Sequence, residues 1–138
     1  LCFALAPHAS HVVLPADAVV PLPDGLPPRR AVLAANVETA LNAVWDAGAG
    51  PGDRISVVGA GVVGAAVAAI AAGLPGAEVE LVDVNPARAS LAAALGCRFA
   101  APDAARGEAD IVFHASASES GLALALALGG FEARIVEM

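Results

Sequence analysis

The stretch Ile55-Ser-Val-Val-Gly59-Ala-Gly61-Val-Val-Gly64 decides the fold of this 138-residue chain. Its apolar first part enters a G-x-G-x-x-G turn, and an alanine-rich helical pattern follows the turn. A second apolar run, residues 79–82, ends at Asp83, nineteen residues past the last glycine of the motif. A strand, a glycine turn, a helix, a second strand and an acid in this order predict a dinucleotide-binding βαβ unit.

Each glycine of the motif has its own task in such a unit. Gly59 permits the tight turn from strand to helix, Gly61 lets a pyrophosphate approach the backbone, and Gly64 lets the helix pack close to the strand. The phosphates would lie on the free N–H groups of the helix N-terminus, where the helix dipole favours negative charge. Asp83 would accept hydrogen bonds from both hydroxyls of the adenine ribose.

The acid at position 83 also bears on the choice of cofactor. A carboxylate there repels the 2′-phosphate of NADP, and Val84 and Asn85 bring no positive charge before Arg88. The sequence therefore favours NAD over NADP. Two alternatives stay open: glycines that serve packing alone, and an S-adenosylmethionine site, which also uses a glycine-rich first turn and an acid after the second strand.

Composition narrows the class of protein further. The net charge is −7 and the chain has no lysine, which argues against nucleic acid or an anionic membrane surface as a partner. No apolar run reaches the length of a membrane span without a glycine or proline break. Cys2 and Cys97 have neither metal nor redox spacing, so we expect a reducing cytoplasm. The chain begins and ends inside apolar runs, so we expect it to be the middle of a longer protein.

Alternating strand and helix patterns from Asp53 onward predict an α/β fold, a Rossmann-type doubly wound parallel sheet. Before them, short strands separated by prolines and a helix over 28–47 with a break near 35–38 are expected. The strands expected before that helix are 1–6, 10–14 and 19–22, those of the sheet are 54–58, 78–82, 98–100, 109–114 and 133–137, and the remaining helices are 62–73, 86–95 and 118–128.

Around this fingerprint, nearly the whole chain resembles the medium-chain dehydrogenase/reductase family, the zinc-type alcohol and polyol dehydrogenases. Residues 3–9 and 19–25 are similar to the end of that family's GroES-like catalytic domain, and 31–48 resembles its bridging helix. Residues 51–54 leading into the glycine loop match a typical family phrase, and 110–116 resembles its fourth cofactor-domain strand. The resemblance implies the end of a GroES-like domain over 1–26 and an NAD-binding Rossmann domain over 27–138, cut before its last strand.

The resemblance also implies a function: NAD-dependent hydride transfer between the nicotinamide and an alcohol or carbonyl substrate, in a cytoplasmic homodimer or homotetramer. Thr39 would pack beneath the nicotinamide ring, and Val62 and Val63 would offer backbone N–H groups to the pyrophosphate. Ala115 and Ser116 would line the cofactor at the carboxyl edge of the sheet. The implied cofactor-binding residues are Thr39, Gly59, Gly61, Val62, Val63, Gly64, Asp83, Val84, Arg88, Ala115 and Ser116. A methyltransferase and a non-catalytic nucleotide-binding domain remain alternatives.

Zinc is the point where the chain departs from the family pattern. The resemblance would place the third catalytic zinc ligand near Ala35, and alanine cannot bind a metal. Glu38, one turn later, is interpreted as a partly solvated helix carboxylate. His114 at the end of an apolar run is interpreted as a core or rim histidine, and Ser116 lies in no G-x-S-x-G elbow. We expect no metal to be held by these residues alone, zinc elsewhere in a full-length protein stays possible, and no catalytic residue is identified.

Overall fold

The computed structural model describes all 138 residues and divides them into two compact units, Leu1–Ala35 and Asn36–Met138. In the first unit, β1 (Cys2–Phe3) pairs antiparallel with β2 (Val20–Pro21). The unit also holds a 3₁₀ turn, η1 (Ala16–Ala18), and a short helix, α1 (Pro28–Ala31).

The strand predictions for the first unit were largely wrong. Only two residues of each outer run form a strand, and 10–14 forms none. The run at 10–14 lacks a neighbouring strand to supply the hydrogen bonds of a ladder, and Val13 is fully exposed. Apolar residues between prolines thus looked like a strand in the sequence, but the run at 10–14 has no partner strand with which to pair.

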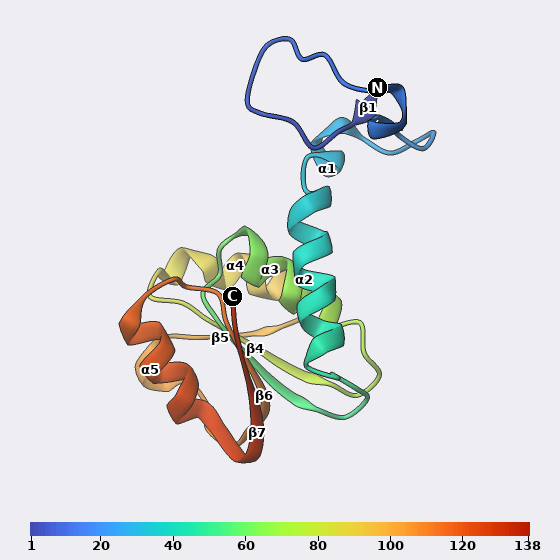
Figure 1. Ribbon diagram of the computed structural model, residues 1–138. Coiled ribbons are helices and arrows are strands. Elements are labelled where there is room, and N and C mark those ends of the chain that lie inside the picture. The colour runs from blue at the N-terminus through green and yellow to red at the C-terminus, as the bar shows by residue number, and fades with distance from the viewer. The chain divides into compact units, whose positions relative to one another are not determined.

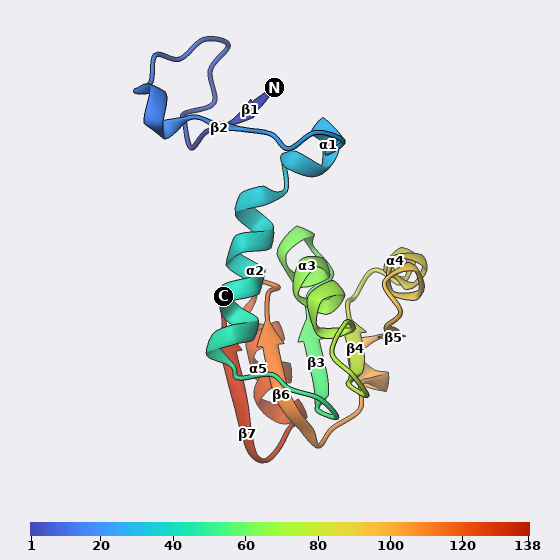
Figure 2. The same cartoon turned by 90° about the vertical axis from the view of Figure 1, so that its right-hand side faces the viewer.

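The second unit is built on a five-stranded parallel sheet in the order β5-β4-β3-β6-β7, as the alternating pattern predicted (Figure 2). Four strands have the predicted bounds, and the last begins four residues earlier than predicted, directly after a helix. Its register against β6 is irregular between Ala109 and Ile111. The strands are β3 (Arg54–Val58), β4 (Glu78–Val82), β5 (Arg98–Ala100), β6 (Ala109–His114) and β7 (Gly129–Glu137).

Helices lie on both faces of this sheet, with α3 and α4 on one side and α5 on the other (Figure 1). Alternate strand residues therefore enter two separate cores. Val57 packs in a cluster with buried residues of α2, α3 and α4, and Val58 packs with Ala125 and Leu128 of α5. The helices are α2 (Ala34–Asp46), α3 (Val62–Ala71), α4 (Ala89–Ala94) and α5 (Glu119–Leu128).

Two helix predictions needed correction. The helix expected over 28–47 is broken at 32–33 into α1 and α2, earlier than the expected break at 35–38. The helix expected over 86–95 begins as a 3₁₀ turn, η2 (Pro86–Arg88), before α4. The Asn85 side chain accepts a hydrogen bond from the Ala87 N–H at 3.0 Å and so caps that tight first turn.

None of the helices combines the length and the apolar character that crossing a membrane requires.

Candidate functional site

A cleft of about 840 Å³ lies at the carboxyl edge of the sheet. It opens where β3 and β6 lie side by side although they are not consecutive strands of the chain. Such a reversal of strand order separates the loops that follow the two strands, and ligands of open α/β sheets bind there. The cleft is lined by Val58, Gly59, Gly61, Val82, Asp83, Val84, Asn85, Arg88, Pro102, Asp103, Ala115, Ser116, Ser118, Ser120, Gly121 and Leu124.

The three glycines of the motif occupy positions with different steric demands. Gly59 has a φ of +106°, and a Cβ there would lie 2.8 Å from the Ala115 carbonyl. A Cβ on Gly64 would lie 1.9 Å from the carbonyl oxygen of Gly59. A Cβ on Gly61, by contrast, would meet nothing within 4 Å, because this residue faces the open cleft. Two glycines thus close the turn and the third leaves room in front of it.

Behind Gly61 lies the N-terminus of α3. Gly61 is the N-cap residue and provides no side-chain hydrogen bond to the helix. The first N–H groups of an α-helix have no carbonyl partner within the helix. Those of Val62 and Val63 are thus not capped by the preceding residue, and the helix dipole makes this end a favourable place for an anion.

Asp83, at the end of β4, is fixed by hydrogen bonds to two loops. Its Oδ2 accepts a hydrogen bond from the Ala60 N–H at 2.6 Å, and its Oδ1 accepts one from the Asn85 N–H at 2.8 Å. Each carboxylate oxygen keeps a further lone pair for a ligand. Arg88 is the nearest basic residue along the chain after Asp83 and lines the same cleft.

A chain of hydrogen bonds runs along the wall of the cleft that follows β6. His114 is 2% exposed, its Nδ1 lies 2.5 Å from Oε2 of Glu137, and its Nε2 lies 2.7 Å from Oγ of Ser116. Ser116 Oγ lies 2.9 Å from Ser118 Oγ, which accepts a hydrogen bond from the Gly121 N–H at 3.1 Å. His114 is thus buried and paired at both ring nitrogens, as the interpretation of a core histidine anticipated.

The structure gathers most of the predicted site residues in one place. Seven line the cleft: Gly59, Gly61, Asp83, Val84, Arg88, Ala115 and Ser116. Val62, Val63 and Gly64 form the first turn of α3 directly after the loop. Thr39 lies on α2, is exposed, and is not among the residues that line the cleft.

Sequence reasoning missed several residues of this site, Glu137 and Gly121 above all. Glu137 reaches His114 because β6 and β7 are parallel and the two residues are register partners. The sequence predicted the strand 109–114 but not which strands lie beside it. The contact between His114 and Glu137 could therefore not be predicted without the order of the strands in the sheet. Gly121 carried a clearer signal, because a glycine inside a helix costs stability and is unusual unless another group approaches it closely.

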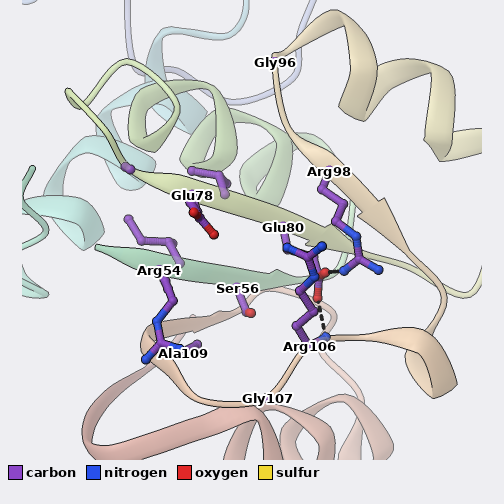
Figure 3. Close-up of a pocket in the computed structure, with 12 residues that line it drawn as sticks. Arg54, Ser56, Glu78, Glu80, Gly96, Arg98, Arg106, Gly107 and Ala109 are labelled. Carbon is purple, nitrogen blue, oxygen red and sulfur yellow. Dashed lines mark hydrogen bonds and ion pairs between the residues drawn. The ribbon is translucent and has the colours of Figure 1, made fainter. Parts of the chain in front are cut away.

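A second pocket, of about 500 Å³, lies at the opposite, amino edge of the sheet (Figure 3). In this pocket Glu80 forms an ion pair with Arg98 and accepts a hydrogen bond from the Arg106 N–H at 2.8 Å. The side-chain Nε of Arg54 lies 3.5 Å from Oδ2 of Asp110. The hydrogen bond from the backbone N–H of Arg54 to Asp110 lowers the pKa of that carboxyl. These interactions join strand ends to each other and to a loop, and we assign this pocket a structural role.

No group of three or more His, Cys, Asp and Glu side chains is arranged to hold a metal ion. Glu38 is exposed on α2 and accepts a hydrogen bond from Asn42 Nδ2 at 2.5 Å.

Comparisons with known proteins agree with this architecture. The model of the family "Alanine dehydrogenase/PNT, C-terminal domain" matches residues 39–122. Solved structures that match include alcohol dehydrogenase TADH from Thermus sp. ATN1, at 27% identity and a TM-score of 0.78, over 87% of this chain and 38% of that one. A thermostable alcohol dehydrogenase from Pyrobaculum aerophilum matches at 28% identity and a TM-score of 0.79, over 90% and 38%.

A further match is the quinone oxidoreductase from Thermus thermophilus, solved also as a complex with NADPH, at 29% identity and a TM-score of 0.77. It covers 97% of this chain and 48% of that one. The chain therefore spans about two fifths to one half of the length of these relatives. The matches are to zinc-type alcohol dehydrogenases and a quinone oxidoreductase of the medium-chain family, in their cofactor-binding domain.

Proposed function

We propose that this chain, which belongs to the alanine dehydrogenase/PNT C-terminal domain family, binds NAD in its carboxyl-edge cleft and serves an oxidoreductase of medium-chain type. The resemblance to that medium-chain family is confirmed by the solved structures, and the chain has the fold of its NAD(P)-binding domain. The reaction we propose is hydride transfer between the nicotinamide and an alcohol or carbonyl substrate.

One observation carries this proposal, the contrast between Gly61 and its two neighbouring glycines. A Cβ on Gly59 or Gly64 would strike the backbone, whereas one on Gly61 would enter free space in front of a helix end without a side-chain cap. Packing accounts for two of the three glycines and leaves Gly61 unexplained. An anionic group that approaches the backbone closely explains it, because it needs both the missing Cβ and the N–H groups behind.

The preference for NAD over NADP rests on Asp83. Its carboxylate lies in the cleft as a hydrogen-bond acceptor, which suits the hydroxyls of a ribose and repels a 2′-phosphate. Two relatives were solved with the phosphorylated cofactor, one with NADPH and one with NADP, so this preference is a property proposed for this chain. Arg88 is the residue that would oppose it, since guanidinium groups pair with phosphates.

In the proposed mechanism the nicotinamide, when bound, supplies the carbon that accepts or donates the hydride. The chain's own residues bind and orient the cofactor. The N–H groups of Val62 and Val63 would stabilise the charge on the pyrophosphate, and Asp83 would hold the adenosine ribose. Ala115 and Ser116 line the site at the end of β6. Thr39, proposed to lie beneath the nicotinamide, would act from α2.

Substrate, assembly and compartment are proposals from the same resemblance: a small alcohol or carbonyl compound, a homodimer or homotetramer, and the cytoplasm. Zinc in a full-length protein also belongs here, because four of the matched structures are named as zinc-binding, zinc-dependent or zinc-bound.

Calorimetric titration of the chain with NADH, NADPH and S-adenosylmethionine tests the proposal. We expect NADH to bind more tightly than NADPH and S-adenosylmethionine not to bind. Tighter binding of NADPH would contradict the argument from Asp83, and binding of S-adenosylmethionine alone would favour a methyltransferase.

A further inference from the structure

The hydrogen-bond chain along the cleft wall consists of Gly121, Ser118, Ser116, His114 and Glu137, and we call it the serine–histidine wall. It runs from the backbone N–H of α5 to a carboxylate at the end of β7. The side chain of His114 is buried, whereas that of Glu137 is 58% exposed. Ser116, Ser118 and Gly121 line the cleft, so one side of this wall is available to a ligand.

With the Glu137 carboxylate ionised and the His114 imidazole neutral, the direction of every hydrogen bond in the wall follows from its two ends. At one end, a backbone N–H can only donate, so Ser118 Oγ accepts from Gly121. At the other end, an ionised carboxylate can only accept, so His114 Nδ1 carries the proton toward Glu137. In a neutral imidazole the other nitrogen, Nε2, is then an acceptor.

With these directions, both serine hydroxyl protons are used within the wall. Ser116 must donate its hydroxyl proton to His114 Nε2, and Ser118 must donate its own to Ser116. A hydroxyl has one donor and two acceptor sites. Each serine therefore has one lone pair left and no proton left for a ligand, so the wall is an acceptor only.

We propose that this wall selects the base of the bound dinucleotide, taking a purine with a 6-amino group, adenine, over one with a 6-oxo group, hypoxanthine. The inference rests on the proposed function, which places the adenosine half in the cleft that holds both Asp83 and Ser116. An amino group donates to the lone pairs of the serines, whereas a 6-oxo group would set acceptor against acceptor. Pro102 and Leu124 line the same cleft and offer apolar contact to a flat ring.

The wall is built at a cost to the backbone, which supports a role beyond packing. Ala117, between the two serines, has a φ of +52°, a conformation that residues with a Cβ rarely adopt. A Cβ on Gly121 would lie 2.0 Å from Ser116 Oγ and 2.8 Å from His114 Nε2. The helix thus contains a glycine where alanine would favour helix formation, and the space is used by the hydroxyl and the imidazole.

The test compares binding of NADH with that of its hypoxanthine analogue, titrated by calorimetry into the full chain at alkaline pH, where imidazoles are neutral. We expect about a tenfold weaker affinity for the analogue, which corresponds to one neutral hydrogen bond lost and an acceptor left opposed. In Ser116→Ala the ratio should fall to about threefold or less, because the acceptor nearest His114 is gone.

Glu137→Gln tests the direction of the hydrogen bonds in the wall, because it leaves both serines in place. An amide can donate as well as accept, so His114 is no longer forced to carry its proton on Nδ1, and Ser116 regains a proton for the ligand. The preference for the amino base should therefore narrow while NADH still binds. Glu132→Gln, an exposed carboxylate of the same strand, is the matched control and should leave the ratio unchanged.

The outcomes separate the two proposals. Binding of both dinucleotides with equal affinity, or an unchanged ratio in both Ser116→Ala and Glu137→Gln, overturns the selection of the base and leaves the dinucleotide site in place. Failure of the unaltered chain to bind either dinucleotide overturns the proposed function and this inference together.

Discussion

The Oδ2 atom of Asp83 accepts a hydrogen bond of 2.6 Å from the backbone N–H of Ala60. This contact joins the end of β4 to the glycine loop that follows β3. One carboxylate therefore belongs both to the wall of the cleft and to the loop that would hold the phosphates. A change at position 83 should affect the two together.

Replacing Asp83 by Ser should narrow the preference for NADH over NADPH. The repulsion between the carboxylate and a 2′-phosphate is removed, and a ribose acceptor is lost with it, so we expect a change of about 1–3 kcal/mol in the difference between the two binding free energies. Titration of both cofactors into the variant measures this. Glu78→Ser, on the same strand but at the other edge of the sheet, is the control. An unchanged ratio in Asp83→Ser would show that the carboxylate does not face the ribose.

Substitutions at two glycines of the loop should affect different properties, binding at Gly61 and stability at Gly64. Gly61→Val should fold normally, because its φ is −73° and the new side chain meets only open space, yet it should lose at least about tenfold in dinucleotide affinity, or about 1.4 kcal/mol. Gly64→Ala should instead lower the free energy of unfolding by about 1–3 kcal/mol, since its Cβ would meet a backbone oxygen. Thermal unfolding and titration of both variants test the contrast. Full binding by Gly61→Val would show that the loop serves packing alone.

Cys97 should be protected from alkylation, whereas Cys2 should react. Cys97 is buried, burial raises the pKa of its thiol, and the thiolate is the reactive form. Because the Cys97 thiol ionises at a lower pH in the unfolded chain than in the folded one, the free energy of unfolding should decrease as the pH rises from the ordinary thiol pKa toward the raised one. Mass spectrometry after iodoacetamide treatment, and unfolding of Cys97→Ala against the unaltered chain between neutral and alkaline pH, check both statements. Equal labelling of the two cysteines would contradict them.

Elemental analysis of a full-length protein should show that zinc, where present, is independent of Glu38. In this chain Glu38 is exposed and hydrogen-bonded to Asn42, and no three candidate ligands come together. Glu38→Ala should therefore retain any zinc, with Asp46→Ala on the same helix as the control. Loss of stoichiometric zinc in Glu38→Ala alone would make this carboxylate a ligand.

Much of the second unit could be predicted because its signals are local. An apolar run, a glycine turn and an acid fix β3, α3 and β4 from neighbouring residues, and parallel strands buried on both faces are almost continuously apolar. The run at 10–14 has the same local appearance, yet it forms no strand because a strand also needs a partner.

The part of the site that was missed depends on distant pairings. His114 and Glu137 are 23 residues apart and meet only because β6 and β7 align in register. The break at 32–33 is likewise not marked by glycine or proline, so helical periodicity alone placed it a few residues late. Local pattern thus predicts elements, and topology decides which side chains share a site.

The close approach of Gly64 to the backbone of Gly59 has a consequence for how this sequence can evolve. The atom that a Cβ at 64 would strike first is a main-chain oxygen, 1.9 Å away, whereas the Cβ of Ala115 is 3.4 Å away. Trimming Ala115 to glycine therefore leaves the obstruction in place, and no exchange of a neighbouring side chain restores the room. We therefore expect no substitution in the side chains around this turn to relieve Gly64→Ala, and lineages that retain the turn should retain this glycine.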